Sequence, residues 1–158
     1  MIMLVLDIEA SGTEYQTHSI VSLGAIDLDN PERRFYEECR IWDGAHIMDG
    51  ALAVNGYTEA EITDPKKQTE AELIQRFMEW SQHIGNRTLV GQNVSFDRDF
   101  VHAACNRAGL PYDLAYRTLD THSLCYMHML KRGLTPPIDL QHRRSALNID
   151  AILNYCGI

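Results

Sequence analysis

Apolar positions along the first quarter of the chain predict three consecutive strands. Runs rich in Leu, Ile and Val over 3–10 and 20–28 are typical of buried strands. Residues 33–41 alternate between apolar and polar side chains, which predicts a third strand. Asp, Asn and Pro at 29–31 favour a turn between the second and third strands. We therefore expect an antiparallel meander at the start of the fold.

The middle of the chain carries helical signals. Thr58 and Thr69 each precede a Glu three residues later, which is the capping-box pattern of a helix N-terminus. A shorter helical signal covers 50–54. After Thr69 the apolar residues recur at helical spacing up to Gly85, at positions Leu73, Phe77, Trp80 and Ile84. We assign this aromatic stripe to the core rather than to a ligand site.

The second half of the chain alternates strands and helices. The pattern predicts strands over 88–91 and 117–120 and helices over 96–108, 121–130 and 145–155. Pro136-Pro137 marks an irregular stretch before the last helix. Because this alternation follows a meander, we expect a single α/β domain over 1–158 with a mixed central β-sheet flanked by helices.

Composition excludes several classes of protein. A chain of 158 residues with 45% hydrophobic and 23% charged residues fits one globular domain. No apolar run approaches the roughly 20 residues of a membrane helix, and the N-terminus lacks the basic region of a signal peptide. The four cysteines form no Cys-x-x-Cys pair, which argues against a disulfide or zinc framework. We therefore expect a cytoplasmic protein with reduced thiols and no membrane association.

Charge is distributed unevenly along the chain. The net charge of -8 argues against a general nucleic-acid coat protein. Residues 1–80 hold six Lys or Arg against 16 Asp or Glu, whereas 81–158 hold eight against six. A phosphate-bearing substrate along the second half would have several basic residues near it, namely Arg98, Arg107, Arg117, Lys131, Arg132, Arg143 and Arg144. For any single one of them, a solvated surface charge is the simpler interpretation.

The first predicted strand carries two carboxylates, Asp7 and Glu9. Alternate side chains of a strand share a face, so the two carboxylates are expected to lie close together. Like charges at short range repel and lose hydration when partly buried, and a divalent cation is the usual compensation. The alternative is that this common pattern marks a strand end facing water. Asp97, near the start of a predicted helix, serves either the helix dipole or a site.

Two segments resemble motifs of the DEDD (DnaQ-like) 3′→5′ exonucleases. Residues 7–12, Asp-Ile-Glu-Ala-Ser-Gly, are similar to the first motif, an Asp-x-Glu followed by Thr or Ser and often Gly. Residues 90–97, Val-Gly-Gln-Asn-Val-Ser-Phe-Asp, resemble the second motif, in which a strand delivers Gly-x-Asn and Phe-Asp then opens a helix. Asp120-Thr121 resembles the Asp-Thr that begins the next helix of the family. Asn-Gly-Tyr-Thr at 55–58 resembles the Asn-Gly-Ile-Thr that the family uses before a short helix beside the substrate. The resemblance covers nearly the whole chain in matching order and implies a ribonuclease H-like fold.

The resemblance also implies a chemistry, which is two-metal hydrolysis of phosphodiester bonds at the free 3′ end of single-stranded nucleic acid. Asp7 would bridge two ions, Mg²⁺ or Mn²⁺, since hard oxygen ligands suit these cations. Glu9 would bind the ion on the nucleophile side. Asp97 would hold the other ion directly or through water.

Substrate contacts follow from the same resemblance. The backbone around Ala10 and Ser11 would meet the terminal nucleotide. Asn93 would brace the site or touch substrate. Phe96 is a candidate for base stacking, although its helical spacing with Phe100 favours core packing.

The third motif of the DEDDh-type members, a His followed about five residues later by an Asp, has no counterpart at that spacing. Without the general-base His, a contribution of about 10²–10⁴-fold is lost. We expect a shortened piece of a longer exonuclease, weakly active or inactive as it stands, rather than a naturally short relative. His142 and Asp150 are eight residues apart and substitute poorly for the motif. His122 and His128 fit surface or packing positions better.

Two other classes of function stay open. One is a non-catalytic nucleic-acid-binding module that retains the exonuclease fold, and the other is a protein-interaction domain, which the acidic first half favours. Against both, three carboxylates beside a buried strand are costly without a cation. The sequence leaves open whether the substrate is RNA or DNA, and the resemblance suggests a homodimer.

Overall fold

In the computed structural model, which describes residues 3–158, five strands form one mixed sheet in the order β3-β2-β1-β4-β5. The strands are β1 Leu4–Ala10, β2 Ile20–Asp27, β3 Arg34–Glu38, β4 Leu89–Gly91 and β5 Thr118–Asp120. β1 pairs antiparallel with β2, and β2 with β3, so the predicted meander is confirmed. β4 pairs parallel with β1, and β5 with β4, which makes the sheet mixed, as expected.

The central strand β1 presents two different faces. Its alternate residues Leu4, Leu6, Ile8 and Ala10 are buried in the main core. Asp7 and Glu9 point to the opposite face, where they stand across from Gly24 and Ser22 of β2. A register shift after Glu9 disturbs the ladder at the end of β1, as β-bulges next to functional sites commonly do.

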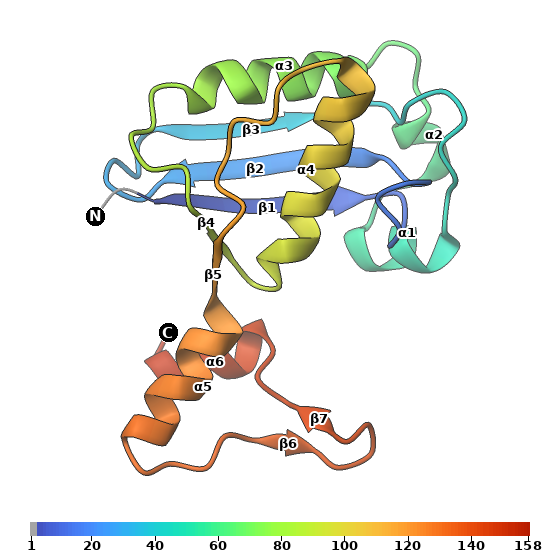
Figure 1. Ribbon diagram of the computed structural model, residues 1–158. Coiled ribbons are helices and arrows are strands. Elements are labelled where there is room, and N and C mark those ends of the chain that lie inside the picture. The colour runs from blue at the N-terminus through green and yellow to red at the C-terminus, as the bar shows by residue number, and fades with distance from the viewer. Residues whose placement is uncertain (1–2) are drawn as a thin grey trace.

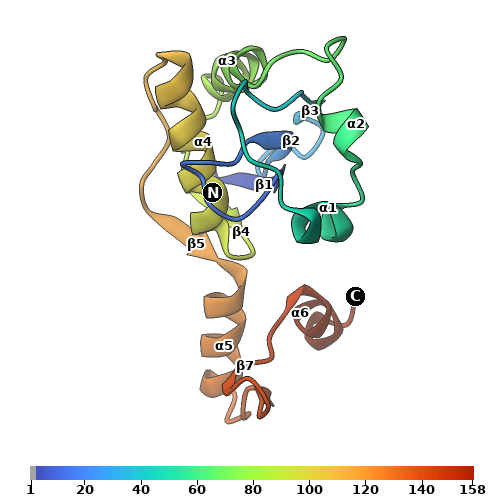
Figure 2. The same ribbon diagram turned by 90° about the vertical axis from the view of Figure 1, so that its right-hand side faces the viewer.

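Two long helices, α3 and α4, pack against the core side of the sheet (Figures 1 and 2). α3 spans Glu70–Ser81 and begins with a complete capping box between Thr69 and Glu72, as predicted. The predicted aromatic stripe is confirmed as core, with Leu73, Phe77 and Ile84 buried and Trp80 packed beside them. The helix itself ends at Ser81, earlier than the predicted end at Gly85, so Ile84 lies after it. α4 spans Val94–Ala108, two residues longer at its start than predicted, and ends at Gly109 with φ of 67°.

Two short helices lie near the end of β1 (Figure 1). They are α1, Asp49–Asn55, and α2, Glu59–Ile62, and the capping box predicted at Thr58 is present. Gly56 ends α1 with φ of 79°, a conformation that glycine adopts without the strain of a side chain. α1 contacts β1, and Nδ2 of Asn55 at its last residue donates a hydrogen bond to the Ala10 carbonyl.

The chain after β5 extends away from the sheet (Figures 1 and 2). It contains α5 Thr121–Lys131, β6 Ile138–Asp139, β7 Arg144–Ser145 and α6 Ile149–Cys156. The stretch expected to be irregular holds the β6–β7 hairpin, whose two-residue strands are too short to show alternation. The last helix begins four residues later than predicted, because Asn148 takes the N-cap position and accepts a hydrogen bond from the Ala151 N–H.

All four cysteines are free thiols, with Cys39, Cys105 and Cys125 buried and Cys156 exposed. Within residues 3–158, no helix combines the length and the apolar surface needed to cross a bilayer.

Candidate active site

Asp7 and Glu9 share one face of β1, as strand alternation predicts. Both line a cavity of about 370 Å³, together with Ser22, Gly24, Tyr36, Asn55 and Tyr57. Gly24 stands beside Asp7 in the ladder, and Tyr36 stands beside Gly24. Because Gly24 has no side chain, the sheet surface between Asp7 and Tyr36 stays open to a ligand.

Asp97 reaches β1 from the other side. β4 pairs with β1 only at Leu4 and Val5, so no strand continues along this edge of β1 toward its end. The Ile8 N–H instead donates a 2.8 Å hydrogen bond to Oδ1 of Asp97, which lies in the first turn of α4 and is only 4% exposed. The short β4 therefore lets a carboxylate take a strand partner's place, at the residue between Asp7 and Glu9.

Gly91 allows the end of β4 to lie close to the backbone of β1. A Cβ at this position would lie 2.8 Å from the carbonyl oxygen of Leu6 and 3.2 Å from the Cβ of Val94. Side chains essentially never approach backbone that closely, so any larger residue would push the start of α4 away from β1. Gly91 thus fixes the position of Asp97.

The three carboxylates act on one another electrostatically. Burial raises the pKa of Asp97 from 3.8 to about 7, the hydrogen bond from Ile8 opposes this rise, and the charges of Asp7 and Glu9 add to it. Burial and then the charge of Asp7 raise the pKa of Glu9. Although the Asp7 side chain is exposed, loss of part of its hydration raises its pKa as well. The cluster is therefore short of positive charge.

Nearby cations do not supply that charge. Within residues 3–158, none of the ion pairs involves Asp7, Glu9 or Asp97. The donor set of three carboxylates fits a hard divalent cation in its chemistry. In the described part of the chain, however, no group of three or more His, Cys, Asp or Glu side chains is placed so that it could hold a metal ion. As they stand, the three carboxylates therefore do not form a ready metal site.

An apolar cavity of about 390 Å³ adjoins the cluster. It is lined by Ile8, Glu9, Ala10, Gly12, Thr13, Met48, Gly50, Ala51, Val54, Asn55 and Phe96. Glu9 and Asn55 line both this cavity and the cavity that contains Asp7. A ligand held in the apolar cavity would therefore have one end beside Glu9.

Two predicted substrate residues have different surroundings at this cavity. Ala10 lines it, and its carbonyl accepts a 3.0 Å hydrogen bond from Nδ2 of Asn55. Ser11 is fully buried, and its hydroxyl donates to the His46 carbonyl and accepts from the Ser19 N–H. Its own N–H and carbonyl are bonded to Ser19 and Met48. These bonds hold the loop and α1 in place, and a direct contact between Ser11 and the terminal nucleotide stays a prediction.

Asn93 does not face the carboxylates. It has φ of 54°, a left-handed conformation that Asn tolerates better than most residues, and its N–H donates to Oδ2 of Asp120 at 2.6 Å. Its side chain lines a third cavity on the other side of the α4 start. The bond to Asp120 braces the start of α4, and a contact between Asn93 and substrate stays a prediction.

Phe96 packs against Phe100, as its helical spacing predicts, and base stacking on its ring stays a prediction. The ring packs 4.8 Å from that of Phe100 and contributes to the edge of the core. It is only partly buried and also lines the apolar cavity.

The pair considered as a substitute for the third motif, His142 and Asp150, does not join the carboxylate cluster, and neither do the two histidines of α5. His142 pairs with Asp139 at 2.7 Å in the β6–β7 turn, and Asp150 is exposed in the first turn of α6. Neither lines a cavity with the carboxylate cluster. His128 bonds the Tyr155 hydroxyl at 2.9 Å, and His122 lines the third cavity.

Asn55 and Tyr36 belong to the site but were not among the predicted site residues. The signal for Asn55 was present in the Asn-Gly-Tyr-Thr segment at 55–58. At Tyr36 the sequence shows only strand alternation. This pattern does not reveal that Tyr36 lines a cavity with Asp7, with Gly24 between them in the sheet.

Comparison with known proteins decides the family. The sequence profile of RNase_T, described as exonuclease, matches residues 4–136. The chain belongs to the RNase_T exonuclease family. DNA polymerase III PolC-type from Listeria welshimeri and from Listeria monocytogenes are each 26% identical to it over 157 residues, covering 93% of this chain and 10% of the relative. The chain therefore spans about a tenth of the length of these curated relatives.

Solved exonuclease structures share the fold. Product-bound exonuclease I has a TM-score of 0.76 at 17% identity and covers 99% of this exonuclease domain and 38% of its own chain. Exonuclease I of E. coli in complex with a 5cy-dA13 oligonucleotide has a TM-score of 0.77 at 19% identity, with 99% and 36% covered. The predicted ribonuclease H-like fold is confirmed. Exonucleases of this family generally use divalent metal ions.

Proposed function

We propose that this domain is a metal-dependent 3′→5′ exonuclease that hydrolyses single-stranded nucleic acid. The observation that carries the proposal is the uncompensated cluster of Asp7, Glu9 and Asp97 beside an open apolar cavity. A chain of the exonuclease family has a reason to keep such a cluster, whereas an inert module gains nothing from its electrostatic cost.

Asp7, Glu9 and Asp97 would hold the cations, which we propose to be two Mg²⁺ or Mn²⁺ ions. When bound, these ions neutralise charge on the phosphate and make the attacking water more acidic. Asp97 is buried and its Oδ1 accepts the Ile8 N–H, so this carboxylate is held against β1 at the residue between Asp7 and Glu9. Glu9 borders both cavities and orients the reacting end of the substrate.

The apolar cavity would receive the terminal nucleoside. Met48, Val54 and Phe96 offer apolar surface for a base or sugar, and the Ala10 backbone forms the wall next to Glu9. Asn55 fixes that wall through its bond to the Ala10 carbonyl. Ser11 acts as a positioning residue, because its bonds to His46, Ser19 and Met48 hold the loop that closes the cavity.

For this chain we propose weak activity. A general-base His and a fourth carboxylate are implied by the resemblance, and the sequence has no His-Asp pair at the required spacing. The non-catalytic module remains the competing outcome, in which oligonucleotides bind but are not cut.

The assay uses 5′-labelled single-stranded DNA and RNA oligonucleotides with Mn²⁺ or EDTA. We expect a ladder shortened one nucleotide at a time from the 3′ end, lost in EDTA and reduced at least about 100-fold in Asp97→Asn. Asp99→Asn is the matched control, since Asp99 lies on the same helix and pairs with Arg98. Equal activity in Asp97→Asn and the wild type would contradict the assignment, and binding without cleavage would favour the non-catalytic module.

The same assay compares RNA with DNA. The cytoplasmic location and the homodimer stay predictions, and sedimentation equilibrium tests the second of them.

A further inference from the structure

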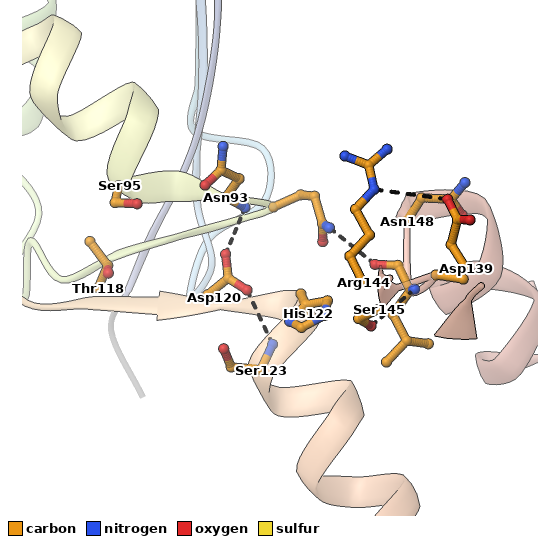
Figure 3. A pocket seen from close by; sticks show the side chains of 13 residues that line it. Asn93, Ser95, Thr118, Asp120, His122, Ser123, Asp139, Arg144, Ser145 and Asn148 are labelled. Atoms are coloured by element: carbon orange, nitrogen blue, oxygen red, sulfur yellow. Dashed lines mark hydrogen bonds and ion pairs between the residues drawn. The ribbon is translucent and has the colours of Figure 1, made fainter. Parts of the chain in front are cut away.

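A third cavity, of about 640 Å³, lies where β4 and β5 end. None of its lining residues belongs to the two cavities beside Asp7 and Glu9. Three segments face it, namely 92–95 at the start of α4, 118–123 at the start of α5, and 139–148 from the β6–β7 hairpin to the start of α6. The two walls are visible in Figure 3, with Asn93, Asp120 and His122 across from Arg144 and Asn148. The lining is mostly hydroxyl, amide, imidazole and guanidinium groups.

The two carboxylates of this cavity already have partners. Asp120 accepts hydrogen bonds from the N–H groups of Asn93 and Ser123, at 2.6 and 3.1 Å. Asp139 accepts from two backbone N–H groups of its turn and pairs with His142 at 2.7 Å. These contacts satisfy acceptor oxygens of both carboxylates and hold the two walls in place.

Arg144 is the cationic side chain of the cavity. Its Nε lies 3.9 Å from Asp139 Oδ2, its side chain is 72% exposed, and within residues 3–158 it donates no hydrogen bond. A guanidinium carries five donors in a planar fork that matches phosphate oxygens. Arg144 therefore retains its donors for an incoming anion, and Ser95 and Ser123 offer hydroxyls on the facing wall.

The first turn of α4 separates this cavity from the carboxylate cluster. Ser95 lines the polar cavity, Phe96 lines the apolar cavity and Asp97 bonds to β1. Successive helical residues point about 100° apart, so Ser95, Phe96 and Asp97 face three different environments from one helical turn. Neighbouring residues of one helical turn therefore line the apolar cavity and the polar cavity.

We propose that the polar cavity binds a sugar–phosphate unit of the nucleic acid upstream of the terminal nucleotide, with the guanidinium of Arg144 on its phosphate. This inference rests on the proposed function and extends it, because it makes the domain prefer oligonucleotides over mononucleotides. Phosphate and sugar contacts of this kind position a strand without reading its sequence.

The test compares Arg144→Gln with Arg143→Gln. Arg143 is the exposed neighbour that does not line the cavity. Affinity for a 5′-labelled oligothymidylate is measured by fluorescence anisotropy, affinity for thymidine monophosphate by competition, and the oligonucleotide length is checked after each titration. We expect Arg144→Gln to weaken the oligonucleotide about tenfold and leave the mononucleotide unchanged, with Arg143→Gln close to the wild type for both.

A second measurement locates the phosphate. A single neutral methylphosphonate linkage is moved along the oligonucleotide, and one linkage upstream of the 3′-terminal one should abolish the difference between the wild type and Arg144→Gln. Equal losses in the two Arg variants would indicate general electrostatic attraction and overturn the inference, as would an unchanged Arg144→Gln. Parallel loss of mononucleotide affinity would overturn it too, by assigning the cavity to free phosphates. If the wild type binds no oligonucleotide, the proposed function itself fails.

Discussion

Glu70 and Asp97 are both buried carboxylates, yet they have opposite surroundings. They are 2% and 4% exposed, and each accepts a backbone hydrogen bond from a strand, from the Ile20 N–H at 2.9 Å and the Ile8 N–H at 2.8 Å. Glu70 also receives two 2.8 Å bonds from Arg107. Asp97 has no cationic partner in the described chain and is destabilised by the charges of Asp7 and Glu9. A compensated carboxylate anchors structure, whereas an uncompensated one is available to a cation.

The compensated pair also frames the site. Arg107 donates a 3.0 Å bond to the Tyr15 carbonyl and lies 5.3 Å from the Trp42 ring centroid, and Glu70 accepts from the Ser19 hydroxyl. These contacts fix the loop between β1 and β2, whose first residue, Ser11, holds α1 beside the apolar cavity. Arg107 was among the basic residues considered for a phosphate, and its pairing with Glu70 gives it a structural role instead.

The largest effect on stability is expected from breaking the compensated pair. Glu70→Gln leaves Arg107 without its charged partner, and we expect the free energy of unfolding at pH 7 to fall by about 3–5 kcal/mol. Glu79→Gln, on the exposed side of the same helix, should change it by less than about 0.5 kcal/mol. Urea denaturation measures both. Equal effects in the two variants would show that the Glu70–Arg107 pair is not an anchor.

Removing the charge of Asp97 is expected to raise the free energy of unfolding when no divalent cation is present, whereas removing the charge of Glu70 lowers it. The folded-state pKa of Asp97 is raised from 3.8 to about 7, so this residue favours the folded state at low pH, and this contribution is lost as the pH rises through that window. Asn keeps the acceptor for the Ile8 N–H without the charge. We expect Asp97→Asn to be more stable than the wild type by about 2–4 kcal/mol at pH 8 in EDTA, and equal to it near pH 3.

Denaturation of Asp97→Asn across pH, beside Asp99→Asn, checks this. A destabilised Asp97→Asn at pH 8 would mean that the ionised carboxylate is already compensated within the protein.

A smaller effect is expected where the site wall is tied to α1. Asn55→Ala removes the bond to the Ala10 carbonyl, and we expect a loss of about 1 kcal/mol in unfolding free energy. Weaker binding of thymidine monophosphate should accompany it, because the wall beside Glu9 is no longer fixed. A variant with lower stability but unchanged mononucleotide affinity would separate Asn55 from the site.

The sequence predicted those parts of the site that depend on local periodicity. Asp7 and Glu9 share a face because they are two residues apart on a strand, and the capping boxes at Thr58 and Thr69 depend on residues three apart. These features need no information about the rest of the fold.

Contacts between residues far apart in the sequence could not be predicted from local periodicity. The orientation of Asn93 depends on Asp120, and the burial of Glu70 depends on Arg107, 27 and 37 residues away in the sequence. Ser11 matches its motif, but its burial follows from His46 and Ser19, which meet it only in the folded chain.

The pKa of Asp97 tests the uncompensated cluster most directly, and ¹³C NMR of the side-chain carboxyl measures it. The structure predicts a pKa of about 7 in EDTA, a lower pKa in Asp7→Asn because one repelling charge is gone, and a marked fall in the wild type when Mg²⁺ is added. A pKa near 3.8 in EDTA that neither Asp7→Asn nor Mg²⁺ alters would contradict the account.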